Sequence, residues 1–185
     1  MILIGLIKQT WATINNMKAL IFLSFVIFLT FLSCSDQQNS PMNKVVIENY
    51  ASFNLQTLND SYLNLDELRG SYILINFWAT WCKPCVKEIP SLNNLNNKFK
   101  NDDNFKLIAI NIGQNKDVVN KFVKNMPPID FIILLDESME LTDWNVKAIP
   151  TTFLLNDKGK IIYKVEGERK WDSPEFISFI NSIIN

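Results

Sequence analysis

The sequence contains no histidine among its 185 residues. Without an imidazole base, Ser-His-Asp and Cys-His catalysis are excluded within this chain, and so is a zinc site with histidine ligands. An excess of charge of one sign is also missing, since the formal net charge is −1 and lysines and acids are interspersed. The chain therefore lacks the basic footprint of a nucleic-acid-binding protein. Hydrophobic residues make up 48%, which is enough for one globular domain and an additional apolar segment.

Cysteine is scarce, and its three copies fall into two groups. Cys34 follows an apolar stretch near the N-terminus, whereas Cys82 and Cys85 are separated by only two residues. With three thiols and no histidine, a closed zinc site would require carboxylate ligands, so we expect no metal. No other pattern indicates a haem or a nucleotide, and the expectation is that the protein has no cofactor.

The N-terminal part of the chain has the composition of a targeting segment. Residues 19–33 are apolar and uncharged, and Lys18 supplies a positive flank. The apolar run is shorter than the ~20 residues of a membrane-spanning helix, and it suits a secretory signal better. We therefore expect a signal peptide over residues 1–33, with Met17 as an alternative start.

Cys34 directly follows this segment, after a leucine and a serine. This arrangement resembles the processing site of bacterial lipoproteins, in which the cysteine is lipidated and becomes the first residue of the mature protein. The sequence departs from that pattern at Phe31, where a leucine is usual. We expect residues 34–44 to be a lipidated cysteine and a flexible tether. The alternative is an uncleaved or differently cleaved signal, with Cys34 incidental.

Residues 45–185 are predicted to form a single α/β domain. Continuous apolar runs over 72–78 and 105–112 predict buried strands, and apolar residues at helical spacing predict a helix over 86–100. Strands that alternate with helices, followed by a hairpin and a closing helix, indicate an α/β sandwich around a mixed sheet. The other predicted elements are a strand over 45–47, a hairpin of 51–58 and 62–65, a helical turn over 66–69, a helix over 117–124, a strand over 131–135, a short helix over 138–144, a hairpin of 151–155 and 160–165, and a last helix capped by Ser173.

Cys82 and Cys85 stand where the first buried strand passes into a helix. Two cysteines at this spacing can close a small disulfide or open to a dithiol. If the first lies at a helix start, free backbone N–H groups and the positive end of the helix dipole stabilise its thiolate. The pattern thus indicates a redox site, and the alternative is a structural disulfide or two unrelated buried cysteines.

The motif from Phe77 to Cys85, Pro90 five residues later and the segment from Ile149 to Phe153 together resemble the thioredoxin superfamily. The similarity is greatest to its extracytoplasmic TlpA/ResA-like branch and covers residues 45–185. It implies a thioredoxin-like three-layer α/β/α sandwich with a mixed sheet, an N-terminal β-hairpin and a central βα insertion.

The resemblance also implies roles for individual residues. Cys82 would attack a client disulfide as a thiolate, and Cys85 would then resolve the mixed disulfide. Pro150 would be a cis proline packed against the cysteines, with the backbone of Ile149 pairing with a bound substrate strand. Trp81 is a candidate for contact with the substrate. The alternative for Pro150 is an ordinary trans proline at the start of a strand.

Glu88 lies three residues after Cys85, and therefore on the same face of the predicted helix. In the ResA-like branch a glutamate at this place affects the ionisation of the cysteines. A partly desolvated Glu88 would take the proton from Cys85. The alternative is a solvated acid near the positive helix end. Asn76 stands where cytoplasmic thioredoxins have an aspartate, which leaves Glu88 as the expected proton carrier.

We therefore expect a membrane-anchored thiol-disulfide oxidoreductase in the bacterial cell envelope, outside the cytoplasm, which reduces client disulfides. One role in the resembled branch is to reduce apocytochrome c before haem attachment. The expected partners are client proteins with disulfides, a membrane-linked electron donor and the membrane through the lipid anchor. Two other functions stay open. One is a peroxiredoxin-like peroxidase, although neither motif cysteine has a threonine three residues before it. The other is a non-catalytic binding lipoprotein with a thioredoxin fold.

Overall fold

The computed structural model of the protein describes residues 40–45 and 52–184. The predicted signal peptide and Cys34 lie outside these ranges, and so do Val46 and Ile47 of the first predicted strand. Within the described ranges, no helix combines the length and the apolar character needed to cross a membrane.

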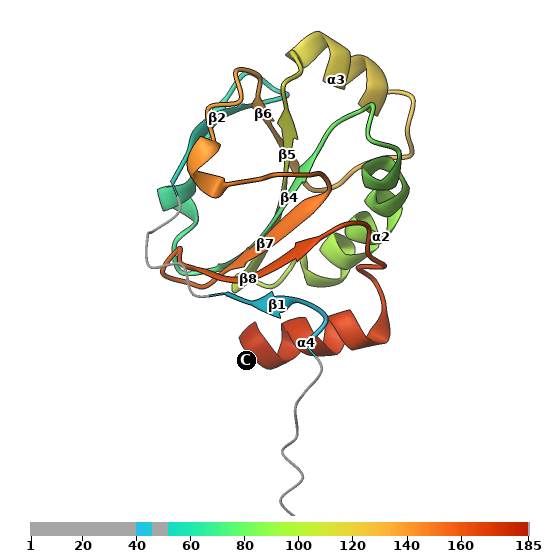
Figure 1. Ribbon diagram of the computed structural model, residues 1–185. Helices are drawn as coiled ribbons and strands as arrows, with labels where there is room; N and C mark the ends of the chain where they lie inside the picture. The colour runs from blue at the N-terminus through green and yellow to red at the C-terminus, as the bar shows by residue number, and fades with distance from the viewer. Residues whose placement is uncertain (1–39, 46–51, 185) are drawn as a thin grey trace, which may run out of the picture. The chain divides into compact units, whose positions relative to one another are not determined.

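In the described residues, eight strands form one mixed sheet in the order β1–β8–β7–β4–β5–β6–β2–β3 (Figure 1). Its centre is parallel and consists of β4 (Tyr72–Trp78), β5 (Phe105–Ile112) and β6 (Ile132–Asp136). The neighbours on both sides pair in antiparallel fashion. They are β7 (Thr151–Leu155), β8 (Ile161–Glu166) and β1 (Asn43–Lys44) next to β4, and the hairpin of β2 (Asn54–Thr57) and β3 (Tyr62–Asn64) next to β6.

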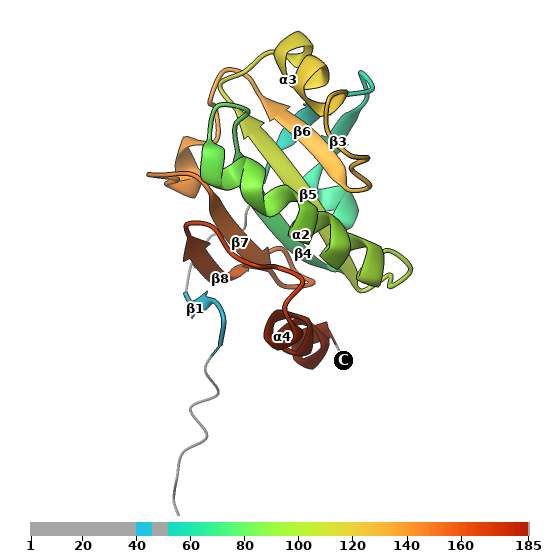
Figure 2. The same ribbon diagram turned by 90° about the vertical axis from the view of Figure 1, so that its right-hand side faces the viewer.

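The α-helices of the described chain all pack on one face of the sheet (Figure 2). They are α2 (Lys83–Phe99), α3 (Lys116–Val123) and α4 (Pro174–Ile184). The opposite face has a separate core, which is covered by the 3-10 helices η1 (Leu65–Leu68) and η2 (Thr142–Trp144). Because successive side chains of a strand point to opposite faces, β4 supplies both cores in alternation. The predicted α/β class with a mixed sheet is confirmed, and 3-10 turns form its third layer.

Local patterns predicted the centre of the sheet well. The strands expected over 72–78, 105–112 and 151–155 coincide with β4, β5 and β7. The expected hairpin is formed by β2 and β3, and α3 and β6 occupy the segment where the βα insertion was predicted. Helix α4 begins as expected, with the backbone N–H of Phe176 donating to Ser173 Oγ at 3.2 Å.

Two predicted helices have different bounds in the structure. Helix α2 begins at Lys83 and not at residue 86, because Cys82 caps it and Pro84 fits its first turn. The helix expected over 138–144 is wrong in extent, since only Thr142–Trp144 are helical, as a 3-10 turn. The carboxylate of Asp136 accepts hydrogen bonds from the backbone N–H groups of Glu140 (2.7 Å) and Leu141 (3.3 Å). These bonds hold the segment in a turn and compete with a helix.

The folded domain also begins earlier than the predicted boundary at residue 45. Met42 is 2% exposed and belongs to the core on the helix-covered face. The next two residues form β1, with Asn43 opposite Lys164 and Lys44 opposite Tyr163 in β8. Residues 40–44 are therefore part of the folded domain and not of a tether.

This boundary can be tested by substitution. Because Met42 is buried, Met42→Ala is expected to lower the free energy of unfolding by about 2–5 kcal/mol. Lys44→Ala changes an exposed side chain of the same strand and should stay within about 0.5 kcal/mol of the parent. Urea denaturation of both variants measures the difference. Equally small effects would mean that the stable fold starts after residue 44.

Candidate active site

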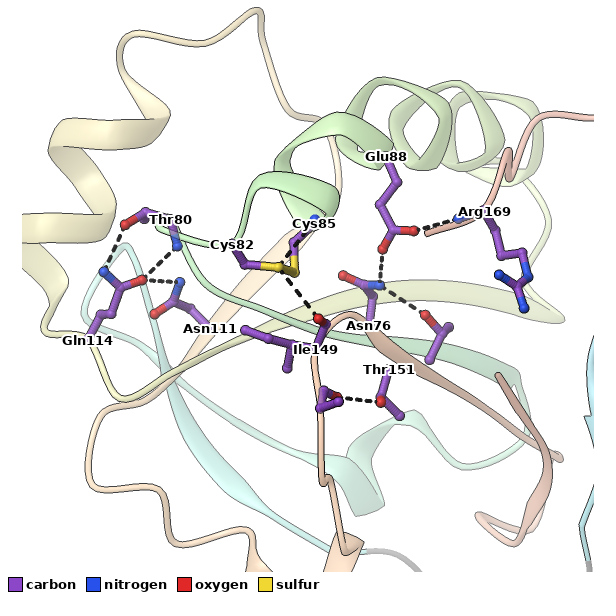
Figure 3. Close-up of a disulfide and its surroundings, with 12 residues drawn as sticks. Asn76, Thr80, Cys82, Cys85, Glu88, Asn111, Gln114, Ile149, Thr151 and Arg169 are labelled. Atoms are coloured by element: carbon purple, nitrogen blue, oxygen red, sulfur yellow. Dashed lines mark hydrogen bonds between the residues drawn. A yellow bond between two sulfur atoms is a disulfide. The ribbon is translucent and has the colours of Figure 1, made fainter. Parts of the chain in front are cut away.

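Cys82 and Cys85 form a disulfide at the N-terminal end of α2 (Figure 3). The two sulfurs are 1.99 Å apart, and the Cα atoms are separated by 5.3 Å. Cys82 is the N-cap residue, and its Sγ accepts a hydrogen bond from the backbone N–H of Cys85 at 3.3 Å. This N–H and the helix dipole would stabilise a thiolate at Cys82. Cys82 is 5% exposed whereas Cys85 is fully buried, so the geometry favours Cys82 as the sulfur that a substrate reaches.

The loop before β7 faces the disulfide. The peptide bond between Ile149 and Pro150 is cis, as the resemblance implied. The carbonyl oxygen of Ile149 lies 3.7 Å from Cys82 Sγ, a contact that becomes an S–H···O hydrogen bond only when Cys82 is reduced (Figure 3). The hydroxyl of Thr151 donates to the carbonyl of Ala148 at 2.6 Å and fixes the backbone around the proline. The loop before β7 thereby presents the backbone carbonyl of Ile149 to the redox centre.

The two tryptophans of the motif have different surroundings. Trp81, directly before Cys82, is 68% exposed. Trp78 is buried at the end of β4, and its ring lies 6.0 Å from that of Phe122. Trp78 therefore belongs to the core, and Trp81 is available for contact with another molecule.

Glu88 is buried in the interior of the domain, at 1% exposure. Its Oε1 accepts a hydrogen bond from Asn76 Nδ2 at 2.7 Å, and its Oε2 accepts one from the Arg169 backbone N–H at 3.0 Å and one from Trp171 Nε1 at 2.9 Å. Burial is the largest effect on this carboxyl and raises its pKa. The three hydrogen bonds lower the pKa but offset burial only in part, and the nearby Glu168 carboxylate raises the pKa further. The alternative of a solvated acid is therefore wrong.

The hydrogen bonds of Glu88 lead away from the two sulfurs. Asn76 Nδ2, which donates to Glu88, also donates to Thr152 Oγ1 at 2.9 Å. Thr152 lies two residues after Pro150 in β7. The carboxyl thus joins α2, β4 and the strand that follows the cis proline in one buried polar chain (Figure 3).

A polar clamp that sequence reasoning missed holds the loop before Cys82. Gln114 Oε1 accepts hydrogen bonds from the Thr80 backbone N–H (2.8 Å) and from Asn111 Nδ2 (3.1 Å). Gln114 Nε2 in turn donates to Thr80 Oγ1 at 2.8 Å. The only signal in the sequence is a glutamine that follows Gly113 at the end of a strand. In the structure, Gly113 has a φ of 67°. That pattern is too general to indicate a role, because it is the fold that brings Thr80 to this place.

The site offers thiol chemistry together with one buried carboxyl. Cys82 provides the more accessible of the two sulfurs, Cys85 a second sulfur bonded to it, and Glu88 a group that binds a proton more readily than a solvated acid. Across the described ranges, no group of three or more cysteine, aspartate or glutamate side chains is placed to hold a metal ion.

The raised pKa of Glu88 makes a testable prediction for the oxidised protein. The folded state binds this proton more tightly than the unfolded chain does, so stability falls as the pH rises from 4.5 through the folded-state pKa. The parent should lose free energy of unfolding over that window relative to Glu88→Gln, which cannot ionise. The glutamine leaves a donor unpaired, which costs about 1–3 kcal/mol at every pH. Urea unfolding at a series of pH values measures both effects, and parallel curves would contradict the raised pKa.

Comparison with known proteins supports this description of the site. The Redoxin family matches residues 38–178, which is most of the chain. The thiol-disulfide oxidoreductase ResA of Bacillus subtilis is 36% identical over 117 residues, which cover 63% of this chain and 64% of that protein. The thioredoxin-like protein YneN of the same organism is 34% identical over 130 residues, which cover 65% of this chain and 75% of that protein. The chain therefore spans a little less than two thirds of the length of that ResA.

A solved structure gives the same result for the fold. The crystal structure of StoA from Bacillus subtilis matches with a TM-score of 0.61 at 29% identity, and the match covers 71% of this chain and 99% of that chain. The predicted resemblance is confirmed by these matches. The chain belongs to the redoxin family, as a thioredoxin-fold relative of the ResA thiol-disulfide oxidoreductases.

Proposed function

We propose that the protein is a thiol-disulfide oxidoreductase that reduces disulfides of client proteins outside the cytoplasm. The observation that carries the proposal is the position of the Cys82–Cys85 disulfide. It caps the redox helix α2, its first cysteine is the more exposed of the two at 5%, and the sulfur of that cysteine lies 3.7 Å from the Ile149 carbonyl beside a cis proline. A purely structural disulfide would not require its first sulfur to lie next to a backbone carbonyl at a helix N-terminus.

The reaction consists of two exchanges. In the reduced protein, the Cys82 thiolate attacks one sulfur of the client disulfide; the mixed disulfide forms, and the second client sulfur leaves and takes a proton. Cys85 then loses its proton and attacks Cys82 Sγ. The Cys82–Cys85 bond forms, and the client leaves as a dithiol. Two electrons pass to the client, so a membrane-linked dithiol donor must reduce the pair again before the next cycle.

Glu88 would handle the proton of Cys85 in the second exchange. It lies one helical turn after Cys85, and burial makes it a stronger proton acceptor than an ordinary glutamate. Its hydrogen-bond partner Asn76 is an amide, which cannot itself take up a proton. The carboxyl is therefore the one group of this buried polar chain that can change its protonation state.

The client would bind across the edge formed by Ile149, Pro150 and Trp81. The Ile149 carbonyl lies next to the attacking sulfur, and the peptide before Pro150 can pair with an extended client segment. Trp81 is a large exposed aromatic residue that directly precedes Cys82 in the chain. Apocytochrome c, which carries a closely spaced cysteine pair, is one client that we include in the proposal.

Two cysteine substitutions test the activity. Cys82→Ser should abolish reduction of an oxidised dithiol peptide, because the attacking sulfur is gone. Cys85→Ser should accumulate a Cys82–client mixed disulfide, because nothing resolves it; non-reducing gel electrophoresis detects this species. Reduction that survives in Cys82→Ser would contradict the proposal. Peroxide consumption without disulfide reduction would support a peroxidase, and an inactive parent with a cellular phenotype would support a binding protein.

The membrane anchor is a separate part of the proposal and rests on the sequence around Cys34. Cys34→Ser should move the protein from the membrane fraction to the soluble fraction and abolish incorporation of labelled palmitate, because the acylated sulfur is lost. Ser35→Ala, at the next position, is the control and should remain with the membrane. A Cys34→Ser variant that still incorporates palmitate and stays in the membrane fraction would overturn the lipoprotein assignment.

A further inference from the structure

A groove lies between the loop before Cys82 and helix α3. Its volume is about 350 Å³, at the lower end of the range for binding pockets and enough for one or two side chains of a peptide. We call it the α3 groove. It is lined by Thr80, Val118, Lys121, Phe122, Asn125 and Met126.

The α3 groove has an apolar surface that remains exposed. Val118 is 44% exposed, although it is a large aliphatic side chain on the first turn of α3. Phe122 and Met126 are partly buried and pack against the core on the helix-covered face. Trp81, which is 68% exposed, directly follows the lining residue Thr80 in the chain. Exposed apolar residues therefore occur both in the groove and in the chain segment that leads to Cys82, as expected of an interaction site.

The charge of the groove is positive. Among the described residues that line it, Lys121 carries the only charge. Lys83, between the two cysteines, adds a second exposed positive charge on the active-site face. Asp117, one turn before Lys121 on α3, is not part of the lining. An acidic side chain of a partner would complement this surface, and a basic one would be repelled.

The groove is held in a fixed position relative to Cys82. Thr80 is both a wall of the groove and the residue two positions before Cys82. Gln114, just before α3, binds the backbone N–H and the hydroxyl of Thr80 at 2.8 Å each. The clamp therefore ties α3, the other wall, to the loop that carries the nucleophile. A side chain bound in the groove would lie in a defined register with the attacking sulfur.

We propose that the α3 groove binds an apolar side chain of the client segment next to the target disulfide, and that Lys121 pairs with an acidic neighbour of that side chain. The inference rests on the proposed function and adds a substrate class to it: clients with an apolar and an acidic residue beside the cysteine. Because Thr80 belongs both to the groove and to the loop before Cys82, a client polypeptide is favoured as the occupant over an unrelated partner.

The test compares peptides that each contain one intramolecular disulfide. The two peptides of a matched pair are identical except at one position near the cysteines, which is leucine in one peptide and serine in the other. Separate pairs place this position before or after the cysteines. In the full-length protein, the leucine peptide should be reduced with about tenfold higher kcat/KM at the favoured position, which corresponds to about 1.4 kcal/mol. Partial burial of one apolar side chain accounts for an effect of this size.

Substitutions in the groove locate the preference. Val118→Glu should reduce the leucine-to-serine ratio to about one, because it places a charge in the apolar part of the groove. Lys121→Glu should exchange the preference between peptides with aspartate and with lysine beside the leucine. Ile132→Glu changes another exposed aliphatic side chain, on β6 and outside the groove, and should leave both ratios as in the parent. Thermal unfolding checks that each variant is folded.

The outcomes are distinguishable. Equal kcat/KM for leucine and serine at every position would overturn the groove proposal while leaving the reductase function intact. A preference that persists in both Val118→Glu and Lys121→Glu would place the client elsewhere and also overturn it. If Val118→Glu instead changes only the oligomeric state, the groove is a self-association surface and the proposal is wrong. If the protein reduces neither the peptides nor the small probe 2-hydroxyethyl disulfide, the proposed function is wrong, and the inference fails with it.

Discussion

The hydrogen bonds of the buried Glu88 carboxyl are the constraint on which the active-site architecture depends. A carboxyl taken out of water must be hydrogen-bonded, and here Asn76, the Arg169 backbone and the Trp171 indole supply the donors. These donors come from β4 and from the segment between β8 and α4. Glu88 thus joins the redox helix α2 both to the centre of the sheet and to the segment before α4, to which Ser91 and Asn94 of the same helix add further hydrogen bonds.

This arrangement also connects the two halves of the redox site. Asn76 bonds both to Glu88 on the redox helix and to Thr152, just after the cis proline. Cys82 Sγ lies 3.7 Å from the carbonyl of Ile149, in the loop just before the same strand. The helix that carries the nucleophile and the loop that would receive a client are therefore positioned by one polar chain inside an apolar core. A change in the charge of Glu88 would act on both halves together.

Local patterns in the sequence were sufficient for the centre of the fold and for the cysteine pair. The apolar runs of β4 and β5 and the spacing of Cys82 and Cys85 are short-range signals, and the resemblance added the cis Pro150. The remaining features depend on contacts between distant segments. Met42 is buried in a core built from distant segments, and it directly precedes β1, which pairs with β8. The partners of Glu88 and the clamp of Gln114 likewise come from segments that the sequence alone does not bring together.

The central claim is that the dithiol serves as a reductant, and the reduction potential of the Cys82–Cys85 pair tests it most directly. Equilibration of the protein in thiol buffers of known potential, with the two redox forms separated by thiol alkylation, gives this value. The account predicts a potential near or below about −250 mV, in the region of thioredoxin. A potential near about −120 mV, that of a strong oxidant such as DsbA, would contradict it and would make the protein a donor of disulfides.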